Sequence, residues 1–362
     1  MLMPLGLQLR IAHLHLPLTV PYRLAFGEQK RFDVILVGLR NEQGKAGWGE
    51  ATILPGYSDE TVEGAWAFAT QLARVCRTDL DIRRMALAAA KTSPFAASAF
   101  LTALDWLDDH PALHRSGRFP LLGTINCKSE APDLLAQEIE ALIGTGYKTL
   151  KVKIGWDVDR DLKQVETVQS IVGDRAKLRI DGNQGYTRDQ AIAFLRRLNP
   201  ADIELVEQPC AAGDWDSAVA AKQAAGVPMM LDESIFTMDD IGRAASLKCA
   251  DYIKLKLMKV GNLDSLAHGL KMISDNGMTA VLGNGVASDL GCWMEIAAAL
   301  GTVSTAGEMN GFLKTPIRIL TPPLHTDGAN VILDGKLFSI DENAVAAHAV
   351  ARDGNWPWTE AA

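Results

Sequence analysis

The chain has 362 residues, a length that fits one large barrel plus a smaller domain. Its residues are 48% hydrophobic and 22% charged, which is ordinary for a globular protein. Its net charge of −8, and the lack of a lysine/arginine stripe with interleaved aromatics, argue against nucleic-acid binding. No uncharged window approaches 18 apolar residues, so no membrane span is predicted, and five scattered cysteines without a CxxC pair indicate free thiols in the cytoplasm.

The first part of the chain, residues 1–120, predicts an α+β domain. Strands are expected at 7–16, 32–40 and 46–52, and the turn Asn41–Gly44 is typical of a hairpin between the last two. The first of these segments is apolar, but it lacks a basic start and is interrupted by polar residues, so we interpret it as a strand and not a secretion signal. Helical patterns follow at about 59–76, 80–91 and 95–109.

Residues 121–325 alternate between short apolar runs and helical patterns. The runs give eight strand candidates, the last at 303–308, and all but the last are followed by a helical pattern. This alternation predicts a (β/α)8-type barrel, and the absence of GxGxxG in the first βα turn disfavours a dinucleotide-binding sheet. Within the final part, 326–362, we expect a hairpin over 325–340 that returns to the N-terminal domain, and a tail over the last dozen residues.

Three acidic residues each end an apolar run, at steps of roughly 24–30 residues, the length of one strand, one helix and two short loops. They are Asp181, Glu207 and Asp232. Neighbouring strands of a barrel lie about 4.8 Å apart, so three carboxylates at their ends can share one cation. Oxygen ligands without Cys or His select Mg²⁺, with Mn²⁺ as a substitute. Capping of the following helix is the alternative for any single acid, and it suits three in a row less well.

Lysines end the apolar runs on either side of these acids. Lys151 and Lys153 are two apart on one predicted strand and point to the same side. Like-charge repulsion from Lys151 is expected to lower the pKa of Lys153 and suit it to act as a base, although a solvated strand edge is the alternative. Lys256 lies on the sixth strand, opposite the second, and we interpret it as the other reactive lysine and Lys254 as structural.

A metal ion that holds a substrate carboxylate makes the α-proton removable, because the enediolate forms next to a dication. Lysines on opposite faces of that intermediate can remove and return the proton. Asn183, Gln208 and Glu233 each follow an acid by one or two residues and are predicted to orient the metal ligands.

Five segments together resemble the muconate-lactonizing-enzyme subgroup of the enolase superfamily. They are KVK at Lys151, DGNQGY at Asp181, VEQP at Glu207, LDES at Asp232 and KLMKVGN at Lys256. The resemblance implies an α/β fold, a (β/α)7β modified TIM barrel with an N-terminal α+β capping domain that the C-terminal segment completes. Lysine or histidine bases beside Mg²⁺ are a general property of this superfamily. Mandelate-racemase-like relatives would place a histidine after the seventh strand, where this chain has Asn284, so the two-lysine subgroup is favoured.

The resemblance also implies where a substrate would bind. The substrate-facing loops of the capping domain correspond to residues 21–29 and 53–59, where Arg23 could pair with an anionic group and Tyr57 could pack on the substrate. A solvated arginine and a packing tyrosine are the alternatives. Dipeptide epimerases of the subgroup carry Asp-x-Asp after the eighth strand to hold an ammonium group. This chain has Glu308-Met309-Asn310, so one carboxylate remains there to contact a cation.

These features predict a Mg²⁺-dependent racemase or epimerase that acts at the α-carbon of a small carboxylate, with an amino-acid derivative as the expected substrate. A dehydratase or cycloisomerase with the same site is the alternative, since β-elimination or lactone opening needs the same parts. A catalytically silent barrel is disfavoured because no base or ligand is missing, and a Schiff-base aldolase because it needs no acid cluster. The resemblance also implies a homo-oligomer.

Overall fold

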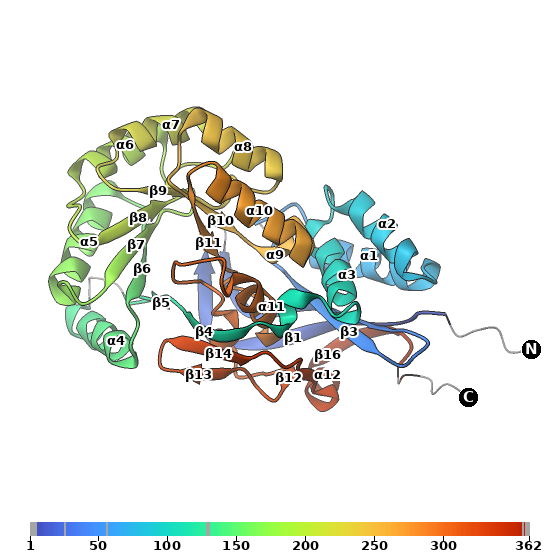
Figure 1. Cartoon of the computed structure of the whole chain (residues 1–362). Coiled ribbons are helices and arrows are strands. Elements are labelled where there is room, and N and C mark those ends of the chain that lie inside the picture. The colour runs from blue at the N-terminus through green and yellow to red at the C-terminus, as the bar shows by residue number, and fades with distance from the viewer. Residues whose placement is uncertain (1–5, 25–26, 56, 128–130, 357, 359–362) are drawn as a thin grey trace, which may run out of the picture.

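The computed structural model describes the greater part of the chain, with only the backbone given at residues 22–24, 27 and 28; the described residues are 6–24, 27–55, 57–127, 131–356 and 358. A curled parallel sheet surrounded by helices lies beside an antiparallel sheet with its own helices (Figure 1). This arrangement confirms the predicted fold class, a modified barrel with an α+β capping part.

The capping sheet is antiparallel and has the strand order β16-β1-β2-β3. Its strands are β1 (Gln8–Leu24), β2 (Gly27–Arg40), β3 (Ala46–Ile53) and β16 (Ala349–Gly354). The three predicted N-terminal strands are therefore confirmed. The hairpin between β2 and β3 is confirmed as well, because the Asn41 N–H donates to the Lys45 carbonyl at 3.0 Å and Gly44 has the positive φ of 81° that this turn requires.

Two helices pack on this sheet, α1 (Val62–Val75) and α3 (Pro94–Leu107), and α2 (Asp79–Ala89) packs on α3. Two glycines of β3 make room for α3. A Cβ at Gly47 would lie 2.3 Å from the Ala103 carbonyl oxygen, and one at Gly49 would lie 2.2 Å from the Ala99 carbonyl oxygen. The predicted helix at 95–109 is thereby confirmed as the central helix of the capping part, buried along nearly its whole length.

The segment between β3 and α1 is attached to the start of α3. The Glu60 carboxylate accepts hydrogen bonds from the backbone N–H groups of Phe95 (2.9 Å) and Ala96 (3.0 Å). These amides lie in the first turn of a helix, where they have no intrahelical partner and favour negative charge. Tyr57 lies three residues before Glu60, so this contact helps to position Tyr57 at the mouth of the barrel.

The barrel sheet contains seven parallel strands in sequential order. They are β5 (Gly123–Thr124), β6 (Thr149–Lys153), β7 (Lys177–Asp181), β8 (Ile203–Glu207), β9 (Met229–Leu231), β10 (Tyr252–Leu255) and β11 (Thr279–Leu282). Helices cover its outer face: α4 (Pro132–Thr145), α5 (Val158–Val172), α6 (Arg188–Arg197), α7 (Trp215–Ala224), α8 (Met238–Leu247), α10 (Leu263–Asp275) and α11 (Asp289–Ala299). The short helix α9 (Leu257–Val260) follows the carboxyl end of β10 and contacts α3 of the capping part. Fully buried Leu150, Val152 and Ile180 lie in the core between strands and helices.

The prediction of an eighth strand at 303–308 was wrong, because only Gly307 of this segment pairs, through a single bridge. One bridge joins Leu121 to Gly307, and the Glu308 N–H donates to the Leu282 carbonyl at 3.0 Å. These contacts connect β11 with the segment before β5 and so close the ring without a full strand. The backbones approach closely here because Gly283 has no side chain, since a Cβ would lie 2.5 Å from the Glu308 nitrogen.

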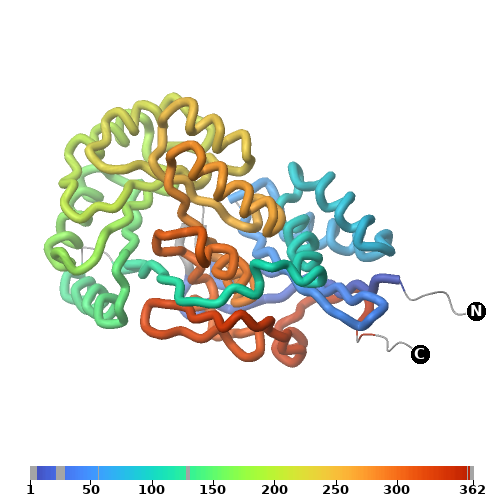
Figure 2. The backbone as a smooth tube through the Cα atoms, in the orientation of Figure 1, coloured from blue at the N-terminus to red at the C-terminus, as the bar shows by residue number. Residues whose placement is uncertain are grey.

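The C-terminal segment returns to the N-terminal part, as Figure 2 shows. The hairpin predicted within 325–340 is confirmed over 325–334, where it pairs with residues 116–120. The predicted tail was wrong at residues 352–354, which belong to β16 because they pair with residues 10–12 of β1. Just beyond them, buried Arg10 donates to the Asn355 carbonyl at 2.9 Å and stacks on Trp356. The remaining elements are η1 (Pro111–His114), β4 (Ser116–Pro120), η2 (Gly311–Lys314), β12 (Leu320–Thr321), β13 (His325–Asp327), β14 (Asn330–Asp334), β15 (Ser339–Ile340) and α12 (Glu342–His348).

Three general predictions concern the whole chain. In the part of the chain that the structure describes, no helix has both the length and the apolar character needed to cross a membrane. The five cysteines are all unpaired, as expected: Cys76, Cys127, Cys210, Cys249 and Cys292. The division into domains at 1–120, 121–325 and 326–362 stays a prediction.

Candidate active site

The carboxyl ends of consecutive barrel strands carry the predicted acids and one predicted base. Lys153, Asp181 and Glu207 are the last residues of β6, β7 and β8, and Asp232 directly follows β9. The parallel register pairs Lys153 with Asp181 and Asp181 with Glu207, so the three lie at the same depth. Lys256 directly follows β10, and with Lys153, Asp181 and Asp232 it lines one cavity. The structure thus brings the lysine–acid–acid–acid–lysine series together.

Two buried lysines lie between the acids. Lys151 Nζ is 2.8 Å from Asp181 Oδ2 and 2.9 Å from Glu207 Oε2. Lys254 Nζ is 3.0 Å from Glu207 Oε1, and both lysines contact the Glu308 carboxylate. Burial alone would raise the pKa of Glu308, but Lys151 and Lys254 hold it well below its usual range. These contacts support a structural role for Lys254, and they show Glu308 already bound to two cations.

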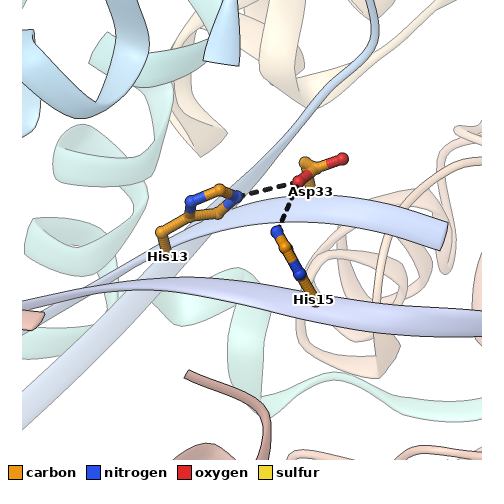
Figure 3. Close-up of side chains that lie close together, drawn as sticks. All are labelled: His13, His15 and Asp33. Atoms are coloured by element: carbon orange, nitrogen blue, oxygen red, sulfur yellow. Dashed lines mark hydrogen bonds and ion pairs between the residues drawn. The ribbon is translucent and has the colours of Figure 1, made fainter. Parts of the chain in front are cut away.

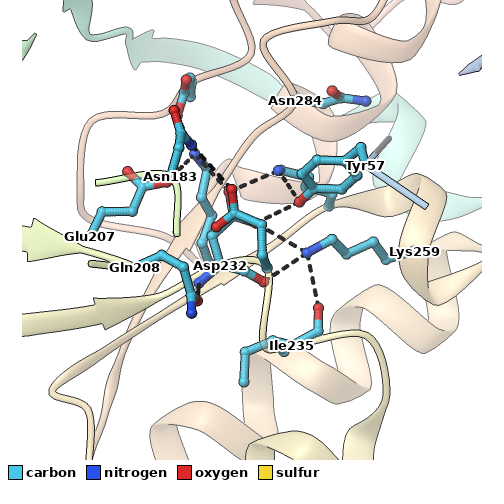
Figure 4. Close-up of polar contacts among 12 residues, drawn as sticks. Tyr57, Asn183, Glu207, Gln208, Asp232, Ile235, Lys259 and Asn284 are labelled. Atoms are coloured by element: carbon cyan, nitrogen blue, oxygen red, sulfur yellow. Dashed lines mark hydrogen bonds and ion pairs between the residues drawn. The ribbon is translucent and has the colours of Figure 1, made fainter. Parts of the chain in front are cut away.

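Asp232 is held from several directions (Figure 4). Lys256 Nζ is 2.8 Å from Oδ2, and Lys259 Nζ is 3.0 Å from Oδ1 and 2.7 Å from the Asp232 carbonyl. The Tyr57 hydroxyl donates to Oδ1 at 2.8 Å and also contacts Lys256. Burial would raise the pKa of Asp232, but Lys256 and Lys259 hold it well below its usual range.

Lys259 is a site residue that sequence reasoning missed. It is fully buried, and its Nζ also donates to the Ile235 carbonyl at 3.0 Å. Burial, opposed by Asp232, lowers the pKa of Lys259 to about 8. The available signal was a lysine in the apolar run LMKV, three residues after Lys256 and thus on the same side of a helical turn.

Asn183 contacts both a predicted base and the acids. Its side-chain oxygen accepts from Lys153, its backbone N–H donates to Asp181 Oδ1 at 2.9 Å, and its amide donates to Glu233 Oε1 at 3.1 Å. Burial and the nearby Asp232 raise the pKa of Glu233 to about 7. Asn183 has a positive φ of 39°, a strained conformation for a residue other than glycine, and such strain is common at functional sites.

Gln208 orders the loop that carries Asp232. Its side-chain oxygen accepts the N–H groups of Asp232 (3.0 Å) and Ser234 (3.2 Å), and its amide donates to the Cys210 carbonyl at 2.9 Å. This arrangement supports the predicted role of Gln208 in orienting an acid rather than in contacting a substrate.

Of the three remaining residues predicted to contact a substrate, only one is shown to line the cavity. Asn284 lines the cavity, and its oxygen accepts the Val286 N–H at 3.2 Å. Asn310 is not among the cavity-lining residues, and its amide donates to the Leu122 carbonyl at 3.4 Å. Arg23 lies in β1, but its side chain is outside the described part of the structure. Sequence reasoning missed the apolar lining of the cavity, namely Leu54, Met258 and Val286.

The chemistry of the donor set fits a hard divalent cation. The acids offer only carboxylate oxygens, the ligands that such a cation prefers, and Asp181 and Glu207 are buried. The oxygens Asp181 Oδ2 and Glu207 Oε2 already lie 2.8 and 2.9 Å from the cationic Lys151 Nζ. Lys151 bridges Asp181 and Glu207, and Lys254 bridges Glu207 and Asp232. With the lysines in between, the three acids do not bring one carboxylate oxygen each to within 4.8 Å of one another. The fit therefore rests on donor type, burial and position at the strand ends.

The fold and this cavity place the chain among capped (β/α)7β-barrel proteins. A family model described as "Enolase C-terminal domain-like" matches residues 134–335. An aromatic dipeptide epimerase from Herpetosiphon aurantiacus is 31% identical over 278 residues, covering 72% of this chain and 76% of that protein. An L-Ala-D/L-Glu epimerase from Clostridium acetobutylicum is 27% identical over 289 residues, covering 75% and 80%. The crystal structure of N-succinyl Arg/Lys racemase from Bacillus cereus superposes with a TM-score of 0.86 at 23% identity, covering 97% and 99%.

These findings decide the family. The chain belongs to the enolase superfamily, in its mandelate racemase/muconate lactonizing enzyme subgroup. Enzymes of this superfamily use a divalent metal ion beside a lysine or histidine base.

Proposed function

We propose that the protein is an isomerase, a Mg²⁺-dependent racemase or epimerase of amino-acid derivatives that uses Lys153 and Lys256 as its two acid/bases. The observation that carries the proposal is the position of these two lysines, which end the second and sixth strand segments of the barrel and line one cavity with Asp181 and Asp232. Relatives at 27–31% identity that are named as epimerases support the same reaction class.

Asp181, Glu207 and Asp232 would hold the metal ion, with Mn²⁺ as a substitute for Mg²⁺. When bound, the ion supplies positive charge that stabilises the enediolate formed by loss of the α-proton. Asn183 and Gln208 keep two of these acids in position through the hydrogen bonds at Asp181 and at the Asp232 backbone.

Proton transfer is assigned to the lysine Nζ atoms. Lys153 removes the α-proton from one enantiomer, and Lys256 returns a proton to the opposite face of the planar intermediate. Asn183 orients Lys153, and Tyr57 orients Lys256, because each touches the corresponding ammonium group directly. Leu54, Met258 and Val286 restrict the access of water to the cavity.

The ion pairs of Glu308 bear on whether the substrate carries a free amino group. Because Lys151 and Lys254 already neutralise this carboxylate, it is poorly suited to bind an α-ammonium group as well. This supports an N-acylated amino acid over a substrate with a free amino group. Both classes belong in the same substrate panel, and equal or higher kcat/KM for free dipeptides would contradict this part of the proposal.

Solvent deuterium exchange at the substrate α-carbon tests the two-base mechanism. The wild type should exchange both enantiomers, whereas Lys153→Ala and Lys256→Ala should each abolish exchange from one enantiomer. Lys163→Ala, at an exposed position of α5, is the matched control and should behave as the wild type. Exchange of both enantiomers in both active-site variants would contradict the mechanism. Product mass separates the dehydratase alternative, since dehydration removes water and racemisation leaves the mass unchanged.

We also propose a cytoplasmic location and a homo-oligomeric state. The location is supported by the five unpaired cysteines, four of them buried, because such thiols persist in reducing compartments. The oligomeric state follows from the family resemblance, and light scattering of the purified protein measures it directly.

A further inference from the structure

Two histidines and an aspartate meet on strands β1 and β2 of the capping sheet (Figure 3). His13 Nε2 lies 2.9 Å and His15 Nε2 lies 3.1 Å from Asp33 Oδ1. One ligand atom from each of the three residues lies within 4.8 Å of the other two. In the described part of the chain, no other group of three histidine, cysteine or acidic side chains has its ligand atoms this close together.

The strand geometry makes this meeting a consequence of the sequence. His13 and His15 are two apart on β1, so their side chains leave the same face of the sheet. Asp33 of β2 is paired with His15 in the antiparallel register and therefore points to that face as well. The side chains of His13 and Asp33 are each 13% exposed and that of His15 is 32% exposed, so an ion from solvent can reach a largely protected position.

The donor set is that of a borderline transition metal. Two imidazole nitrogens and one carboxylate oxygen are a usual three-residue set for Zn²⁺, with water in the fourth position. Zn–N and Zn–O bonds of about 2.0–2.1 Å bring ligand atoms to within roughly 3.5 Å of each other. Here the two histidine–aspartate distances are 2.9 and 3.1 Å, and all three ligand atoms lie within 4.8 Å of one another.

Arg31 is the one competing cation among the described side chains around Asp33. Its Nε lies 3.2 Å from Asp33 Oδ2, and the side chain is 53% exposed. An exposed arginine pair of this kind is worth little, about 1 kcal/mol or less, and the arginine can move into water. A metal ion bound by Asp33 and two histidines would therefore displace it.

We propose that His13, His15 and Asp33 form a Zn²⁺ site that joins β1 to β2, distinct from the Mg²⁺ site proposed in the barrel. The register between these strands is irregular from Pro17 to Tyr22, just beyond the histidines. Further along β1, Val20 and Pro21 line a hollow together with Lys153. The ion would fasten the two strands immediately before the stretch that reaches towards the active site.

Zinc binding to the metal-stripped, full-length protein tests this proposal. Zn²⁺ is titrated in the presence of excess Mg²⁺, which occupies hard oxygen sites, and the number of ions bound is measured by elemental analysis after gel filtration. Visible absorption of bound Co²⁺ gives a second readout, because a tetrahedral site with imidazole ligands absorbs strongly. The test variants are His15→Ala and Asp33→Asn, the second of which keeps the side-chain shape in case the first does not fold. Controls are His325→Ala, at an exposed position of β13, and Asp232→Asn in the barrel.

The proposal predicts one Zn²⁺ per chain in the wild type and in both controls. His15→Ala and Asp33→Asn should weaken binding by at least about 100-fold, since even residues that only orient a ligand contribute 10–100-fold. Three results would overturn it: no Zn²⁺ retained beside Mg²⁺, unchanged affinity in both test variants, or loss of binding in Asp232→Asn alone. The last result would assign the zinc to the barrel.

Discussion

Glu50→Gln is predicted to remove a pH-dependent weakness at the junction between the capping sheet and the barrel. Glu50 lies in β3 and is buried, and it accepts hydrogen bonds from the Ser288 N–H at 2.8 Å and from the Ser288 hydroxyl. Ser288 is the N-cap of α11, the last barrel helix, so this carboxyl group connects the two parts of the molecule. A glutamine keeps the shape and the acceptor for the Ser288 N–H but cannot ionise.

The magnitude follows from the pKa of Glu50. Burial, opposed by the Ser288 hydrogen bonds, raises this pKa from 4.5 to about 7. The folded state therefore holds its proton more tightly than the unfolded chain does, and stability is highest below pH 4.5 and falls as pH rises to about 7. At about 1.4 kcal/mol per pKa unit, ionisation of Glu50 costs about 3 kcal/mol in total, of which roughly 2.5 kcal/mol is lost between pH 5 and pH 8.

Urea unfolding of the wild type and Glu50→Gln at pH 5 and pH 8 measures this directly. The free energy of unfolding of the variant, relative to that of the wild type, should increase by roughly 2.5 kcal/mol between the two pH values. Buried acids that have no electrostatic contact with Glu50 change both proteins alike and cancel in this difference. Glu42→Gln, in the exposed β2–β3 turn, is the control and should show no such increase. A difference between wild type and Glu50→Gln that does not change with pH would refute the reasoning.

Three further predictions concern the site and its support. Tyr57→Phe removes the hydroxyl that contacts Asp232 and Lys256. Because hydrogen bonds to charged groups are worth about 1.5–3 kcal/mol, steady-state kinetics should show kcat lowered by about 10–100-fold, with a smaller effect on KM. Gly49→Ala places a Cβ 2.2 Å from a backbone oxygen of α3 and should lower the free energy of unfolding by at least about 1–3 kcal/mol. Gly144→Ala is the control, because a Cβ there meets nothing within 4 Å, and it should leave stability unchanged; thermal unfolding measures both variants. Mg²⁺ at 100 times its Kd should stabilise the wild type by about 2.7 kcal/mol, an effect that Asp181→Asn should largely abolish in the same assay.

The acids and lysines of the barrel could be predicted from sequence because one simple periodicity controls them. Each ends a short apolar run, and parallel strands with similar connections bring such ends to one edge. Lys259 and Glu50 were not predicted as parts of the site and its support, because each is placed by tertiary contacts with distant segments. The same limit explains β16, whose residues showed no strand pattern and are held by pairing with β1, while Trp356 just beyond the strand stacks on Arg10.

The register of the barrel strands connects the fold to the chemistry. Because side chains alternate along a strand, a slip of one residue in β7 against β6 would turn Asp181 away from Lys151 and Lys153 and towards the helices. That slip would also move Ile180 out of the apolar layer between strands and helices, where it is fully buried, and bury a carboxylate without its cations. The apolar residues that alternate with the acids and lysines therefore set the depth and direction of the reactive groups, and a change in this layer should alter catalysis even though it touches no substrate.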